Sequence, residues 1–143
     1  MPARKMSKAD FETLATFRYQ LRRFLRFSEE LTHRNGITSL QYQLMLQIKG
    51  FPGRDWATVA ELAERLQAKH HGVVALVSRC EAAGWVSRNT SRSDQRCVEV
   101  RLSPAGLLCL ERLAGLHRDE LRSIQGGFVV PGIETATPAD GSA

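Results

Sequence analysis

Arginine side chains gather in and around one short polar turn of the sequence. The stretch SRNTSRSDQR contains three of them, at Arg88, Arg92 and Arg96. A guanidinium group stays charged at neutral pH and matches the geometry of phosphate, so a cluster of this kind can bind nucleic acid. A basic loop by itself is usually just a solvated loop. The choice between these two interpretations depends on the elements that hold the turn.

Two short apolar runs flank this turn and are typical of β-strands. WVSRN, residues 85–89, precedes the turn, and CVEVRL, residues 97–102, follows it with alternating polar and apolar side chains. The two runs predict a β-hairpin that holds the turn out from the body of the protein. A basic hairpin tip can reach the minor groove of DNA, where narrow A·T-rich stretches attract arginine.

A predicted helix from His70 to Ala83 precedes the hairpin and divides into two faces, because residues three and four apart share one side of a helix. The expected core side consists of Val73, Leu76, Val77 and Cys80. The expected outer side consists of His71, Ala75, Ser78 and Arg79, with Val74 at its margin. Such a helix fits the major groove and presents side chains to base edges. A solvated helix face has the same pattern, but the basic hairpin that follows favours DNA.

Four further helices are predicted from capping signals and apolar periodicity. The first spans about 8–32, and two short helices begin at Thr38 and Thr58, each with a capping-box partner three residues later. The last spans about 104–124, after Ser103 as its N-cap. Three short helices followed by a hairpin describe a winged helix-turn-helix, a fold that places its reading helix in the major groove.

The predicted helices at 8–32 and 104–124 each have a long apolar seam that a monomer would leave exposed to water. We therefore expect a homodimer that is joined by both helices. The expected fold class is mainly α with a small β-hairpin, in one domain over 1–125 with its DNA-binding lobe at about 38–102. Residues 126–143 contain paired glycines and little periodicity, and they predict a flexible C-terminal tail.

Composition limits the class of protein. The chain has 143 residues, enough for one domain with a core, and its net charge of +5 permits an anionic partner. No apolar run approaches the roughly 20 residues of a membrane span, and no signal-peptide core is present, so we expect a cytoplasmic protein without a membrane partner. Cys80, Cys97 and Cys109 are scattered, which argues against a disulfide scaffold and a structural zinc site.

Motifs for catalysis and metal binding are missing from the sequence. It has no G-x-S-x-G, no phosphate-binding glycine loop, no H-E-x-x-H and no obvious carboxylate pair. The adjacent His70 and His71 point about 100° apart on a helix, so only distant histidines brought together by folding could share a metal. We expect no enzyme, no metal and no cofactor. A winged-helix module that binds protein instead of DNA is an alternative.

Several stretches, in this order, resemble the MarR family of bacterial transcription regulators over roughly residues 8–124. They are LTHRNGITSLQYQLMLQI, TVAELAERL, HHGVVALVSRCEAAGWVSR, SDQR and VRLSPAG. The SDQR stretch followed by LSPAG is specific, whereas AELAERL occurs in many helix-turn-helix proteins. The resemblance implies a dimeric repressor of nearby genes that binds a palindromic operator in double-stranded DNA and is released by a small-molecule effector. A regulator without small-molecule control is an alternative.

The resemblance also implies roles for single residues. Arg96 matches the wing arginine that enters the minor groove or meets the backbone, and Asp94 matches the acidic partner that holds this arginine in place. Lys69 stands where the family usually has a serine or threonine cap for the reading helix. The positions expected to contact DNA are Lys69, His70, His71, Val74, Ala75, Ser78, Arg79, Arg92, Asp94 and Arg96.

Many members of this family bind small aromatic ligands in a crevice between the dimer helices and the DNA-binding lobe. The residues of this sequence that could line such a crevice are Tyr19, Phe27, His33, Met45 and Trp56. Each of them, taken singly, is more simply explained as a core residue. The family's sixth helix, which takes part in dimerisation, has no counterpart in the predicted tail.

Overall fold

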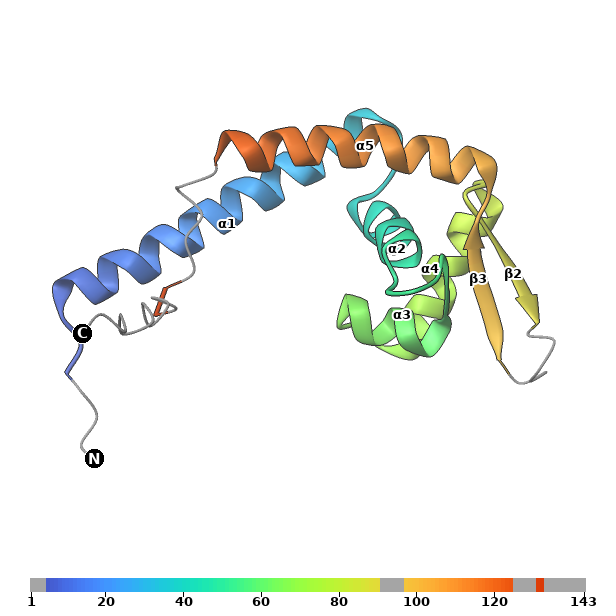
Figure 1. Ribbon diagram of the computed structural model, residues 1–143, viewed down its shortest axis with the longest axis horizontal. Helices are drawn as coiled ribbons and strands as arrows, with labels where there is room; N and C mark the ends of the chain where they lie inside the picture. Colours follow the sequence, from blue (N-terminus) through green and yellow to red (C-terminus); the bar gives the residue numbers. More distant parts are fainter. Residues whose placement is uncertain (1–4, 91–96, 125–130, 133–143) are drawn as a thin grey trace, which may run out of the picture. The chain divides into compact units, whose positions relative to one another are not determined.

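The structure is a computed structural model that describes residues 5–90, 97–124 and 131–132 (Figure 1). The predicted tail at 126–143 lies outside the described residues except for Pro131 and Gly132. In chain order the elements are α1 (Lys8–Arg34), α2 (Ser39–Lys49), β1 (Trp56–Thr58), α3 (Val59–Leu66), α4 (His70–Ala82), β2 (Val86–Thr90), β3 (Val98–Leu102) and α5 (Pro104–Ser123). These elements confirm a mainly α-helical chain with a small sheet.

Two compact units make up the chain. One consists of residues 1–27 and 119–143, and the other of residues 28–118. The second unit contains α2, α3, α4 and the three strands, and its core lies between these helices and the sheet. Its completely buried side chains include Leu44, Met45, Ile48, Leu62, Val77 and Val100. This unit contains the predicted DNA-binding lobe.

The predicted capping boxes are present and fix where the helices begin. At the start of α1, the Asp10 backbone N–H donates to Ser7 Oγ at 3.1 Å, and the Ser7 N–H donates to the Asp10 carboxylate at 2.9 Å. The boxes at Thr38 and Thr58 have the same two-way bonding. Each box satisfies backbone donors that helix geometry leaves without a partner. The end of α1 also follows the prediction, since Gly36 adopts a φ of +73° just beyond it.

The predicted hairpin is confirmed, but it belongs to a sheet of three strands within the described residues, in the order β1-β3-β2. β2 and β3 pair antiparallel from Val86 with Leu102 to Thr90 with Val98. β1 pairs with the other side of β3 and was not predicted. It is only three residues long, and its last residue, Thr58, is also the N-cap of α3, so the helix signal hides the strand.

Ser103 joins the hairpin to α5. Its backbone N–H donates to the Trp85 carbonyl at 2.9 Å, its hydroxyl donates to the Gly84 carbonyl at 2.6 Å, and the Gly106 N–H donates to that hydroxyl at 2.9 Å. Gly106 lies so close to Trp85 that a Cβ atom on it would be 2.0 Å from the Trp85 carbonyl oxygen. The LSPAG stretch thus has a structural explanation: serine caps, proline begins the helix and glycine permits close approach.

His117 is a buried residue of α5. Its neighbours within residues 28–118 come from α1, α2 and α5 itself. Its ring stacks on Tyr42, with 4.2 Å between centroids and 8° between planes. Nδ1 lies 2.7 Å from the Leu113 carbonyl, which can only accept, so Nδ1 donates; Nε2 lies 2.8 Å from the Ser28 hydroxyl. Burial also raises the pKa of Tyr42. The sequence shows an isolated histidine here, but the structure shows a polar junction between three helices.

Replacing His117 with leucine is expected to lower the free energy of unfolding by about 1–3 kcal/mol, because the buried Ser28 hydroxyl loses its partner and burying it then incurs a desolvation cost. Urea denaturation followed by circular dichroism measures the change. The matched control is His33→Leu, since His33 is exposed, and its effect is expected to stay within about 0.5 kcal/mol. Equal midpoints for His117→Leu and wild type would show that the junction adds no stability.

Candidate nucleic-acid interface

The two predicted faces of α4 are present. Val73, Leu76, Val77 and Cys80 are buried, with exposed fractions of 5% or less. Burial also raises the pKa of the Cys80 thiol to about 11, so this cysteine remains a neutral thiol at physiological pH. On the outer side, the structure exposes His70, His71, Val74, Ala75 and Arg79 and half-buries Ser78. The side chains predicted to read DNA are therefore available at the surface of one helix.

A tight turn between α3 and α4 sets the start of this outer face. Gln67 adopts a left-handed φ of +51°, which costs a residue other than glycine about 1–3 kcal/mol. Its side-chain amide donates to the Glu64 carbonyl at 2.8 Å, and its backbone N–H donates to the same carbonyl at 3.1 Å. Lys69 then caps α4 without a side-chain cap hydrogen bond. The first N–H groups of α4 have no partner within the helix, and the Lys69 ammonium group cannot accept from them.

The hairpin formed by β2 and β3 is the predicted wing. β2 follows α4 after the turn at Gly84, which has a φ of +85°, and packs against α4. Arg92, Asp94 and Arg96 belong to the tip between the strands and lie outside the described residues. The antiparallel register brings the ends of the two strands together on either side of this tip. The roles of the three tip residues therefore stay predictions.

An ion pair that sequence reasoning missed joins the wing to α4. The Glu81 carboxylate, in the last turn of α4, accepts from Arg88 of β2 three times: from Nη2 at 2.9 Å, from Nε at 3.2 Å and from the backbone N–H at 3.1 Å. The hydrogen bonds from Arg88 hold the pKa of Glu81 below its ordinary value. No repeat or motif in the sequence indicates this ion pair, because Glu81 and Arg88 belong to different elements.

A second cluster holds the loop before α3. The Arg54 guanidinium lies over two aromatic rings, 4.1 Å from the centroid of Phe51 and 3.9 Å from that of Trp56, and it also pairs with Glu61. Burial tends to raise the pKa of Glu61, but hydrogen bonds from Thr58 and Arg54 outweigh it, so the pKa is lowered overall. Glu61 is the capping-box acid of α3, and the cluster thereby fixes the first helix of the helix-turn-helix.

The five residues predicted to line an effector crevice have different surroundings. Met45 is completely buried in the core of residues 28–118, and Trp56 packs under Arg54. His33 is exposed and lines a hollow of about 440 Å³ together with Thr32, Ile37 and other residues at the end of α1 and the start of α2. Tyr19 is 59% exposed and Phe27 is half-buried. Their role in effector binding stays a prediction.

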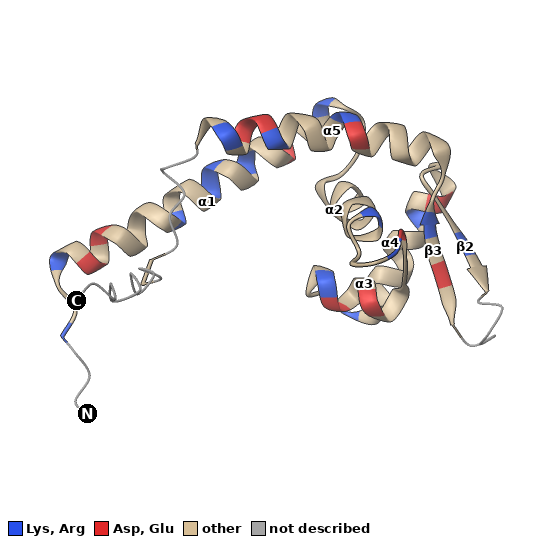
Figure 2. Cartoon of the chain, in the orientation of Figure 1, with Lys and Arg blue, Asp and Glu red and all other residues tan. Residues whose placement is uncertain are grey.

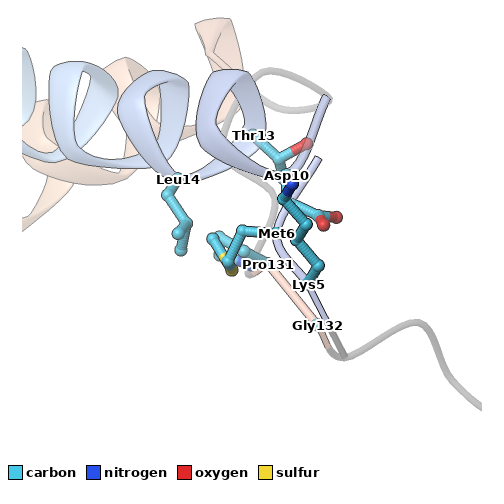
Figure 3. Close-up of a pocket in the computed structure, with 7 residues that line it drawn as sticks. All are labelled: Lys5, Met6, Asp10, Thr13, Leu14, Pro131 and Gly132. Atoms are coloured by element: carbon cyan, nitrogen blue, oxygen red, sulfur yellow. The ribbon is translucent and has the colours of Figure 1, made fainter. Parts of the chain in front are cut away.

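A larger hollow, of about 650 Å³, lies at the start of α1 and was not predicted. Figure 3 shows the side chains that gather there, which include the apolar Met6, Leu14 and Pro131 and the polar Lys5 and Asp10. Thr13 and Gly132 complete the lining. The polar side chains stand among apolar ones, and no charged group in the lining is buried. This hollow therefore has no built site for a specific ligand.

Charges of both signs are interspersed over α3 and the strands of the lobe, and basic residues recur along α1 (Figure 2). Among the described residues, no three His, Cys, Asp or Glu side chains come together in a group that could hold a metal ion. No helix in the described part of the chain combines the length and the apolar character that crossing a membrane requires. The exposed His70, His71 and Arg79 make the outer face of α4 a polar surface.

Comparison of the sequence with known proteins finds similarity to the same family that its motifs resemble. A family model described as MarR family matches residues 35–96, from the end of α1 to the wing tip. The chain is also similar to the "Putative transcriptional regulatory protein for hcr operon" of Thauera aromatica, with 27% identity over 96 residues. The match covers 67% of this chain and 56% of that protein, so the chain spans little more than half of the relative's length.

Solved structures share the fold. AbsC, a MarR family transcriptional regulator from Streptomyces coelicolor, matches with a TM-score of 0.74 at 20% identity, over 90% of this chain and 86% of that chain. A mutant MarR from E. coli complexed with operator DNA matches with a TM-score of 0.63 at 24% identity, over 71% of each chain. These likenesses confirm the predicted winged helix-turn-helix fold. Together with this fold, the family model shows that residues 35–96 of the chain are similar to the MarR family.

Proposed function

We propose that this chain is a transcription regulator that binds double-stranded DNA through α4 and the wing. The observation that carries the proposal is the exposed outer face of α4, with the wing packed directly beside it. A helix of this kind fits the major groove, and a basic hairpin beside it reaches the neighbouring minor groove. The similar MarR from E. coli that is complexed with operator DNA supports DNA as the partner.

The start of α4 suits a phosphate group. Lys69 precedes the helix, and the first backbone N–H groups have no helical partner, so a phosphate oxygen can accept from them while the lysine supplies charge. Such contacts position a protein on DNA without reading its sequence. Val74, Ala75 and Ser78 follow on the outer face, where small side chains permit close approach to base edges. Arg79 can contact either a base or a phosphate.

A second copy of the chain completes the proposed regulator. α1 exposes large apolar side chains, with exposed fractions of 56% for Phe11, 45% for Leu14 and 47% for Leu25. Exposed apolar patches on soluble proteins mark binding surfaces. A homodimer would cover this face and present two α4 helices to a palindromic operator, since half-site spacing follows protein symmetry. Repression of nearby genes and release by a small aromatic effector belong to the same proposal.

Fluorescence anisotropy with a labelled nonspecific duplex, measured from low to physiological salt, tests DNA binding directly. Binding should weaken steeply as salt rises, because each neutralised phosphate releases a counterion and contributes about −0.9 to the slope of log K against log salt. No binding at any salt would refute the proposal and favour a winged-helix module that binds protein.

Arg96→Ala is expected to weaken binding by about 1–3 kcal/mol per wing, the range for losing one well-placed contact with DNA. The salt slope should also become shallower, because fewer phosphates are neutralised. Asp94→Ala should act in the same direction if Asp94 orients Arg96, even though it removes a negative charge. The same anisotropy titration, repeated at several salt concentrations with circular dichroism as the folding control, measures both. An unchanged affinity and slope for Arg96→Ala would mean that the wing is only structural.

A further inference from the structure

The carboxylate of Glu81 stands on the DNA-facing stripe of α4. Val74, Ser78 and Glu81 are spaced i, i+4 and i+7 along α4, so they share one side of the helix. Val74 and Ser78 are two of the positions predicted to read DNA. A negative charge at the end of this stripe would repel phosphate, and an acidic residue in the last turn is also unfavourable for the helix dipole. Local stability and DNA attraction both argue against a glutamate here.

Arg88 explains why a glutamate occupies this position. One carboxylate accepts three hydrogen bonds from this single residue of β2, two from the guanidinium and one from the backbone N–H. The backbone bond fixes the strand itself, whereas a bond to a long side chain alone would leave the strand free to shift. The side chains are 35% and 38% exposed, and exposed ion pairs add little to stability. The pair is better suited to fixing a position than to stabilising the fold.

We propose that Glu81 and Arg88 form a positioning pair that holds the wing at a fixed place beside the DNA-facing stripe of α4, and that operator affinity depends on it. The inference rests on the proposed function. Glu81 touches no DNA in this scheme: it holds β2, and β2 carries the tip. Arg88 in turn neutralises the carboxylate, so the stripe presents no unpaired negative charge to the phosphates.

The proposal predicts a change in DNA affinity that is opposite in sign to the change expected from simple electrostatics. Removing an acidic residue from a DNA-binding surface normally strengthens binding, because the surface becomes more positive. Glu81→Ala is nevertheless expected to weaken binding about tenfold, the effect of one misplaced contact with DNA. The probe is a duplex selected by the wild-type protein from a random pool. The matched control is Glu111→Ala, which makes the same change of charge on the exposed side of α5 and should not weaken binding.

The salt dependence of DNA binding distinguishes a positioning role of the Glu81–Arg88 pair from a direct contact with DNA. Glu81→Ala should not make the slope of log K against log salt steeper, because Glu81 contacts no phosphate and a displaced wing neutralises no additional ones, while the preference for the selected duplex over a nonspecific duplex falls. If Glu81→Ala instead binds more tightly with a steeper slope, Arg88 has been freed to contact phosphate and the pair is not a positioning device. Affinity equal to wild type overturns the proposal in the same way.

A second variant keeps the test decisive if Glu81→Ala does not fold. Glu81→Gln has the same shape but only one acceptor oxygen and no charge, so it can keep either the backbone hydrogen bond or the bonds to the guanidinium, which use different oxygens in the carboxylate. It should weaken binding in the same direction and by less, at an unchanged melting temperature; binding as tight as wild type overturns the proposal. If the wild-type protein binds no duplex even at low salt, the proposed function fails as well. If wild type binds and the Glu81 variants do not weaken, only the positioning role fails.

Discussion

Gly106→Ala is expected to lower the free energy of unfolding by about 3 kcal/mol, the upper end of the usual cost of overpacking. A Cβ atom at this position would lie 2.0 Å from the Trp85 carbonyl oxygen and 2.9 Å from the Trp85 carbonyl carbon. The obstacle is backbone, which cannot swing aside as a flexible side chain can. The Trp85 carbonyl also accepts the Ser103 N–H, so moving it strains the start of α5.

The higher helix propensity of alanine acts in the opposite direction, but its contribution is smaller than the cost of the clash with Trp85. Alanine is favoured over glycine inside a helix by about 1 kcal/mol. Gly115→Ala, in the same helix, is the matched control, because nothing lies within 4 Å of a Cβ atom there and only the propensity term remains. Chemical denaturation should therefore show opposite signs, with Gly106→Ala destabilised and Gly115→Ala stabilised. Two stabilised variants would contradict the close packing at Trp85.

Leu14→Arg is expected to convert the proposed dimer into a monomer. Leu14 is 45% exposed on α1, so an arginine there should not disturb the fold of the single chain. Across a dimer interface, the same arginine becomes a buried charge without a partner, which costs about 3–5 kcal/mol. Symmetry places the change on both copies. Sedimentation at micromolar protein concentration should then show the monomer mass, and affinity for a palindromic duplex should fall with it.

The control for this variant changes the same helix on another side. Thr16 is also exposed, and two residues along a helix turn the side chain by about 200° from Leu14. Thr16→Arg adds the same charge and is expected to leave the dimer intact. A Leu14→Arg protein that sediments as a dimer would show that the apolar face of α1 is not the interface. Unchanged circular dichroism for both variants excludes unfolding as the cause.

The sequence predicts what local patterns encode. The capping boxes at Thr38 and Thr58 need only a side chain and a backbone three residues apart, and both form. The buried side of α4 follows from a periodicity of 3.6 residues and is also confirmed. The wing strands follow from alternation and a polar turn. Each of these features is decided within one turn of helix or one pair of strands.

Features that depend on the approach of distant segments could not be predicted. His117 and Ser28 meet across 89 positions of sequence, and no local pattern links them. The contact between Gly106 and Trp85 likewise depends on how α5 crosses the turn after α4. Glu81 and Arg88 are only seven residues apart, but the turn at Gly84 changes the direction of the chain between them. For the candidate site, the sequence therefore predicts which side chains of α4 are exposed better than it predicts the contacts that orient the elements.

The order of the strands has a consequence for how this lobe behaves among other proteins. β3 is central, so β1 and β2 are the edges of the described sheet, and an edge strand offers unpaired N–H and C=O groups to any passing strand. β1 is only three residues long, which is too short for stable pairing with a strand of another protein. On β2, the Glu81 carboxylate occupies the Arg88 N–H and places charge along the edge. The same glutamate that we propose as a positioning residue would thus also protect the sheet from edge-to-edge aggregation.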